Sequence, residues 1–219
     1  TDPVGRDIFA RSGWGGRISL SVGVAVAVIA VGFGLVLGLL AGYIRVLDAI
    51  IMRVMDGLMA IPGILLAIAL ISLTGATLFT VIVAITIPEI PRVVRLVRSV
   101  VLTVREEAYV EAAIAAGTKL PSIMIRHILP NTIAPLIVQA TYVCASAMLT
   151  ESILGFLGAG IPPEIPSWGN IMSEGRTYFQ LCPWIIFFPG VALGVTVMSV
   201  NIVGDGLRDT LDPRIAKKM

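Results

Sequence analysis

Long apolar runs separated by short charged stretches organise this chain. Between Arg17 and Arg45 lie 27 residues without a charge, which is about 40 Å of helix at roughly 1.5 Å per residue and enough to cross a bilayer. The 32 uncharged residues between Asp56 and Glu89 are too many for one crossing. We expect a break near Thr74 and Gly75. The pattern predicts a polytopic helical membrane protein.

We expect about five membrane-spanning helices in an all-α fold. They are predicted at 18–44, 57–73, 76–98, 128–150 and 177–204. Residues 1–17 are expected to form an external segment before the first span. The transmembrane region then covers 18–204, and 205–219 form a cytoplasmic tail. The chain begins with Thr rather than Met, so we expect that a segment before it is missing.

Basic residues are distributed unevenly between the two sides that these spans define. Twelve lie on the side that carries residues 105–130, and four lie on the other side. The twelve are Arg45, Arg53, Arg92, Arg95, Arg98, Arg105, Lys119, Arg126, Arg208, Arg214, Lys217 and Lys218. Cytoplasmic loops carry the excess of Lys and Arg. The bias predicts that the 105–130 loop and the C-terminus are cytoplasmic.

Composition agrees with the membrane assignment. Hydrophobic residues make up 57% of the chain and charged residues only 14%, with a mean hydropathy of +0.95. A soluble domain could not solvate its surface with so few charges. A net charge of +2, without basic runs interleaved with aromatics, argues against nucleic-acid binding. Lipid is the expected surrounding medium.

A polar island from Glu106 to Gly117 stands out in this oily sequence. Acids at its start, alanines along it and a glycine at its end are typical of a short helix. We expect a positive φ at Gly117, a second helix beginning at Pro121, and a boundary at Pro130 before the next apolar run. The small alanine side chains would let another protein approach this helix closely.

Glu89 is the one acid deep in an apolar stretch, between Pro88 and Pro91. Charges inside membrane helices are costly and usually face water or a partner. Glu89 is therefore a candidate for the substrate pathway, although pairing with Arg92 or a place near the membrane surface would also explain it. For Arg92 and the arginines after it, extension toward the headgroups is favoured over an anion site or a proton relay.

Two further patterns leave alternatives open. Gly34, Gly38 and Gly42 share one helix face, which suits packing within the chain better than a subunit interface. The stretch 155–173 is rich in Gly and Pro and predicts a partly re-entrant external loop. That loop would either shape an outer gate or pack on the bundle as a lid. The acids in or just before it, Glu164 and Glu151, do not stand out as site residues.

Motifs for covalent chemistry are not visible in the sequence. There is no Gly-Lys pair and hence no phosphate-binding loop. Cys144, Cys182 and the single histidine, His127, lack the spacing of a metal or catalytic site. We therefore expect no catalytic residue, no metal and no cofactor in this chain. Any ATP that drives the protein would be bound by another subunit.

The island resembles a known signature. Glu111, Ala112 and Ala113, then Gly117, then Leu129 and Pro130 are similar to the EAA loop of bacterial ABC importer permeases. His127 departs from that pattern because it occupies a slot that is usually hydrophobic. The stretches 1–7, 51–56, 155–158, 168–169 and 204–213 also resemble the dipeptide, oligopeptide and nickel permease branch, so the resemblance covers essentially the whole chain.

The resemblance implies a type I ABC importer permease fold in a bacterial inner membrane, with a further span upstream of this chain. It further implies a second homologous permease, two cytoplasmic ATP-binding subunits and an external solute-binding protein. Contact with the ATPase would fall to Glu111, Ala112, Ala113, Gly117, Leu129 and Pro130. The solute would be a peptide, nickel or a glutathione-like ligand, and the sequence does not choose among them.

A stand-alone secondary transporter or channel is the alternative. Such a protein needs a charged or broken-helix coupling site near the midplane, ideally repeated in two halves. Glu89 is the one candidate for that site, and the sequence shows no convincing internal repeat. The ABC importer assignment is therefore preferred.

The orientation can be tested with single cysteines at Thr118 and Glu164, in a background where Cys144 and Cys182 are replaced. We expect a membrane-impermeant thiol reagent to label position 164 from outside and position 118 only after the membrane is opened. Labelling of both positions from outside would contradict the span assignment.

Overall fold

The computed structural model describes residues 5–211, and the regular structure in this range is helical throughout. This confirms the all-α prediction. In chain order the elements are α1 (Ile8–Tyr43), α2 (Arg45–Met59), α3 (Gly63–Thr74), α4 (Leu78–Val104), α5 (Ala108–Ala115), α6 (Leu120–Ile123), the π-helical turn η1 (Met124–Ile128), α7 (Leu129–Phe156), α8 (Trp168–Thr177) and α9 (Trp184–Leu211).

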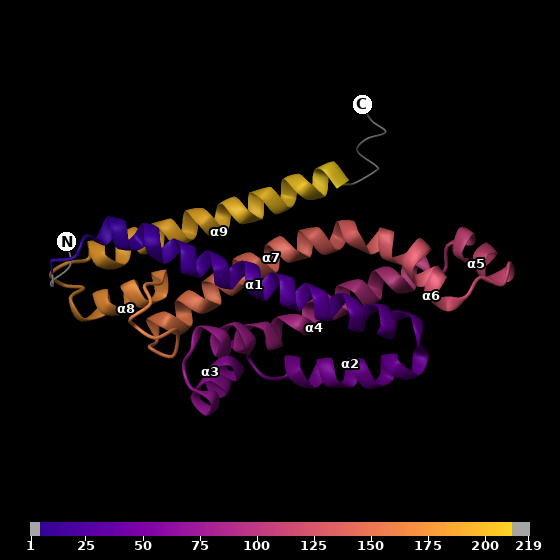
Figure 1. Ribbon diagram of the computed structural model, residues 1–219, viewed down its shortest axis with the longest axis horizontal. Coiled ribbons are helices and arrows are strands. Elements are labelled where there is room, and N and C mark those ends of the chain that lie inside the picture. The colour runs from indigo at the N-terminus through magenta and orange to yellow at the C-terminus, as the bar shows by residue number, and fades with distance from the viewer. Residues whose placement is uncertain (1–4, 212–219) are drawn as a thin grey trace.

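The helices form one elongated bundle (Figure 1). Helix α1 packs against both α4 and α7, and α7 packs against α9. Helix α8 and the first turns of α1 lie at one end of the bundle, whereas α5, α6 and the corner between α1 and α2 lie at the other. Motifs at residues 1–4 and beyond 211, including three of the basic residues counted above, lie outside the described residues.

The expected number of five spans is approximate. By length and composition, 8–43, 120–156 and 184–210 could each cross a membrane, and α2 with α3 forms a fourth candidate that is bent by 87°. Helix α4 is 27 residues long, about 40 Å at roughly 1.5 Å per residue. Glu89 lies near its middle, and its second half carries Arg92, Arg95 and Arg98. Counting α4 gives five.

Several predicted boundaries were wrong because charges do not mark helix ends. Helix α1 starts at Ile8, ahead of Arg17, because Asp7 caps it by accepting a hydrogen bond from the backbone N–H of Phe9. The stretch 57–73 is not one helix, since it is broken around Pro62, which lacks the N–H that a continuing helix needs. Helix α9 begins only at Trp184 and continues past 204 to Leu211.

The Gly- and Pro-rich stretch 155–173 packs on the bundle as a lid, and α8 begins inside it at Trp168. The Trp168 side chain is buried and donates from Nε1 to the carbonyl of Ser12 at 2.9 Å. The Asn170 amide donates to the carbonyls of Ile161 and Ile165, both at 3.0 Å. The Trp168 bond holds the loop against α1 and the Asn170 bonds brace the loop internally, so the stretch packs on the bundle, as the lid alternative predicted.

The glycine face of α1 packs within the chain. Gly34, Gly38 and Gly42 are buried and lie against Val93, Val97 and Val101 of α4, respectively. The glycines of α1 and the valines of α4 both recur every four residues, so the valine side chains fit into the groove that the glycines leave on α1. A Cβ on Gly38 would lie 2.6 Å from the Cβ of Val97. Only glycine permits this approach.

Replacing Gly38 with leucine should therefore destabilise the bundle. Overpacking costs about 1–3 kcal/mol, and the melting temperature of the purified protein in detergent should fall by several degrees. The matched control is Gly32→Leu on the same helix, where a Cβ meets nothing within 4 Å. Equal melting temperatures for the two variants would contradict the proposed contact.

Candidate functional site

Helix α5 ends in a turn that requires glycine. Gly117 has a φ of +77°, so the positive φ expected from the sequence is confirmed. The N–H of Gly117 donates to the carbonyl of Ile114 at 2.9 Å, and the N–H of Thr118 donates to the carbonyl of Ala113 at 3.1 Å. This is the Schellman pattern of helix ends. It reverses the chain so that α6 can begin beside α5.

His127 and its neighbours attach α5 to the start of α7. Val110 of α5 is fully buried together with Ile123 and Ile128. The rings of Tyr109 and His127 lie 6.1 Å apart. The Asn131 side chain donates to the Tyr109 hydroxyl at 3.2 Å and to the carbonyl of His127 at 2.6 Å. His127 therefore has a structural place in this end of the bundle.

The sequence pattern predicted a helix boundary at Pro130, and this prediction was wrong. Helix α6, η1 and α7 follow without a break, and the N–H of Leu129 bonds back five residues to the carbonyl of Met124. A π-helical turn is wider than an α-helical one. Pro130 stands at the start of α7, where the π-helical turn passes into α-helix. The chain therefore continues as a helix although Pro130 has no N–H to donate.

The structure brings the EAA-like residues together at one end of the bundle (Figure 1). Among them Glu111, Ala112, Gly117 and Pro130 are exposed, and Ala113 and Leu129 are half-buried. Apolar side chains are exposed beside them at Tyr109, Ile114 and Leu120. Small and apolar residues on a protruding helix form a surface on which another protein can dock.

Glu89 lies in the middle of α4 and is only 5% exposed. Its carboxylate accepts a hydrogen bond from the hydroxyl of Ser146 on α7 at 3.0 Å. Arg92 contacts both carboxylate oxygens at 3.3 Å. The pairing with Arg92 considered above is therefore present, and Glu89 also lines a cavity.

The other arginines of α4 pair with acids of α2 rather than extending toward headgroups. Arg95 donates to Asp56 at 2.6 Å. Arg98 contacts both oxygens of Asp48, with Nη2 at 2.7 Å from Oδ2. These pairs hold α2 alongside α4. Sequence spacing could not find them, because the partners are 39 and 50 residues apart.

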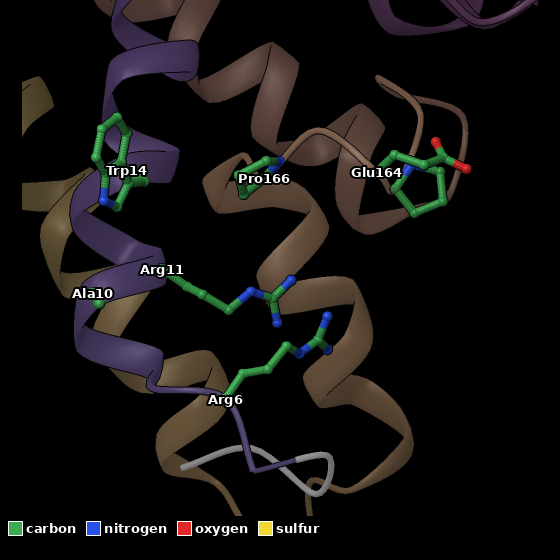
Figure 2. Close-up of a pocket in the computed structure, with 7 residues that line it drawn as sticks. Arg6, Ala10, Arg11, Trp14, Glu164 and Pro166 are labelled. Carbon is green, nitrogen blue, oxygen red and sulfur yellow. The ribbon is translucent and has the colours of Figure 1, made fainter.

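A second cavity, of about 340 Å³, opens at the end that carries α8. Figure 2 shows the Arg6 and Arg11 side chains extending into the same space, with Glu164 farther away on the loop. Glu174 of α8 pairs with both arginines, at 2.8 Å and 2.7 Å respectively. Within residues 5–211 no three His, Cys, Asp or Glu side chains gather as a metal site would require.

Glu151 is the buried acid that sequence reasoning passed over. It is fully buried near the end of α7 and accepts a hydrogen bond from the Ser19 hydroxyl at 2.8 Å. The Ser19 oxygen also lies 3.4 Å from the backbone N–H of Trp168. Glu151 thus connects α7, α1 and α8. Its position at the end of a long apolar run was the available signal.

Comparisons with known proteins agree with this architecture. Residues 34–217 match the family described as binding-protein-dependent transport system inner membrane component. The chain is 58% identical to a Sinorhizobium fredii protein named "Probable peptide ABC transporter permease", over 100% of this chain and 75% of that protein. It is 46% identical to a dipeptide transport system permease of Alkalihalophilus pseudofirmus, over 98% and 71%.

A further relative is the glutathione transport system permease of Pectobacterium atrosepticum, at 41% identity over 98% of this chain and 71% of that protein. Among solved structures, an inward-facing methionine ABC transporter superposes with a TM-score of 0.69 at 21% identity, covering 89% of this chain and 94% of that one. That likeness shows the fold. The chain belongs to the family of binding-protein-dependent inner membrane components and is an ABC importer permease subunit.

Proposed function

We propose that the chain forms half of the translocation pathway of an ATP-driven peptide importer. Relatives named for peptide, dipeptide and glutathione transport support a peptide or peptide-like solute. A second homologous permease would supply the other half of the pathway. ATP would be hydrolysed by two cytoplasmic partner subunits, and an external solute-binding protein would deliver the solute.

The observation that carries the proposal is the exposed helix α5 with its terminating Gly117. Its motif residues protrude at the end opposite α8, where most of the basic residues also lie. The basic bias supports a cytoplasmic position for this end. Glu111 would meet a basic group or backbone amides on the ATPase, while Ala112 and Ala113 allow close approach.

Attachment of α5 to α7 supports a mechanical role. A force on α5 would pass through the contacts of Val110, Tyr109 and Asn131 into the start of α7. Helix α7 is continuous for 28 residues and reaches α8 at the other end. Closure of the ATPases would thus reorient α7 and give alternating access, with Glu89 lining the pathway between the two ends.

Gly117→Val should abolish uptake in the assembled importer. A β-branched residue at a φ of +77° is strained by about 1–2 kcal/mol, and relief of the strain would redirect α6 and loosen the ATPase contact. Gly117→Asn is the matched control, because asparagine tolerates this conformation. Membrane insertion, ATPase co-purification and uptake are measured together. Normal uptake by the valine variant with ATPase bound would place the coupling element elsewhere.

Glu111→Ala should have a milder effect. Glu111 is exposed, and an exposed ion pair contributes only about 0–1 kcal/mol. We expect ATPase affinity to fall by no more than about fivefold and uptake to persist. Titration of the permease complex with purified ATPase measures this. A loss as complete as that of Gly117→Val would show that Glu111 is buried on docking.

A further inference from the structure

A cavity of about 400 Å³ lies where three parts of the fold meet. They are the break between α2 and α3, the stretch of α4 around Pro88, and the part of α7 that carries Ser146. Its polar side chains are those of Glu89, Arg92, Ser146 and Thr150, and its apolar wall includes Leu58, Ile61 and Ile64. A few converging polar groups on an apolar wall, in a volume of about 300–1,000 Å³, are typical of small-molecule sites.

The cavity lies at membrane depth. Glu89 is the twelfth of the 27 residues of α4, about 17 Å from the start of the helix at roughly 1.5 Å per residue. A carboxylate at that depth must face protein or water. Ile61 and Ile64 are exposed within this chain, and the Arg92 side chain is 47% exposed. The cavity is therefore open to a molecule outside the chain.

The charged pair in the cavity is loose. Arg92 lies 3.3 Å from each oxygen of Glu89, whereas charge-assisted bonds are usually about 2.7–2.9 Å long. Arg11 and Glu174 of the same chain reach 2.7 Å. Only the Ser146 hydroxyl holds Glu89 at ordinary distance, 3.0 Å. An incoming ligand can improve on the Arg92 contact.

Backbone acceptors add to the negative character of this stretch. Pro88 and Pro91 lack an N–H, so the carbonyls of Ala84 and Ile87 lose their usual helical donors. Helix α2 ends and α3 begins beside the cavity, so a partial negative and a partial positive charge both border it. The carboxylate of Glu89 favours an ammonium group, and the exposed guanidinium of Arg92 favours a carboxylate.

We propose that this cavity binds the two termini of a short zwitterionic peptide. Glu89, supported by Ser146, takes the α-ammonium, Arg92 takes the α-carboxylate, and the side chains contact Leu58, Ile61 and Ile64. Such a ligand carries no net charge. When it separates Glu89 from Arg92, its ammonium pairs with Glu89 and its carboxylate with Arg92, so no charge is left unpaired at membrane depth. The peptide as ligand rests on the proposed function.

Photo-crosslinking in the assembled permease–ATPase complex tests the site. The complex is reconstituted in lipid nanodiscs without the solute-binding protein, so that the binding protein contributes no selectivity. The probe is p-benzoylphenylalanyl-alanine, and adducts on this chain are mapped by mass spectrometry. We expect an adduct at the cavity wall, at Met59 or Ile61. Dialanine should compete at least about tenfold better than N-acetyl-dialanine or dialanine amide.

Two substitutions should each remove one of these preferences. Glu89→Gln keeps the size of the side chain and an acceptor for Ser146, and should abolish the preference for dialanine over its N-acetyl form alone. Arg92→Gln should abolish the preference over the amide alone. Asp56→Asn is the matched control. It removes the charge that pairs with Arg95 between α2 and α4, and both preferences should remain.

Unchanged preferences in both variants, or adducts only outside the cavity, would overturn the proposal and leave Glu89 and Arg92 as a packing pair. If Glu89→Gln fails to assemble, Arg92→Gln and the competition series on the unmodified chain decide the question. Uptake and ATP hydrolysis stimulated by the loaded binding protein are measured on parallel samples. Their failure in the unmodified complex would count against the proposed function, whereas normal uptake without selective crosslinking would count against this site alone.

Discussion

The close contact between α1 and α4 sets the geometry of this permease. Because Gly34, Gly38 and Gly42 have no side chains, the backbone of α1 lies against the valine row of α4. The contact brings the α1–α2 corner to the end of α4, where Arg98 pairs with Asp48. It also buries one face of α4 and leaves Glu89 directed toward α7. Both candidate sites depend on this packing.

Polar groups connect the helices wherever side chains enter the apolar bundle. Glu89 meets Ser146 at mid-bundle, and Glu151 meets Ser19 near the α8 end. An unpaired polar group at such depth is costly, so each bond selects one arrangement of neighbouring helices. Helix α7 takes part in both, and its other end holds α5 through Asn131. Helix α7 thus contacts α5, the cavity at Glu89 and the lid formed by residues 155–173.

Breaks in the helices have local causes and functional consequences. Proline interrupts the path from α2 to α3, stands inside α4 beside Glu89, and is accommodated by a π turn at the start of α7. Pro62 and Pro88 both line the cavity at Glu89. The π turn lets α6 and α7 continue as one helix from the α5 end into the bundle.

The sequence by itself determined what depends on local chemistry. Uncharged runs identified the long helices, alanines and acids identified α5, and the positive φ of Gly117 followed from its place at a helix end. Glu89 was also singled out, because it is an acid within an apolar stretch of the sequence. The EAA-like signature indicated the family because its residues lie at fixed spacing within one short stretch, 111–130. Helix ends were less certain, since charged residues such as Arg17 can lie within a helix.

Only the tertiary structure decided which distant residues meet. Arg95 and Arg98 pair with acids of α2, and Glu151 accepts a hydrogen bond from Ser19, 132 residues away. Trp168 bonds the 155–173 loop to α1. Such pairings depend on how helices are rotated and stacked, which one-dimensional spacing does not contain. The angle of 87° between α2 and α3 has the same origin: Pro62 ends the helix locally, and packing of both helices against α4 sets their directions.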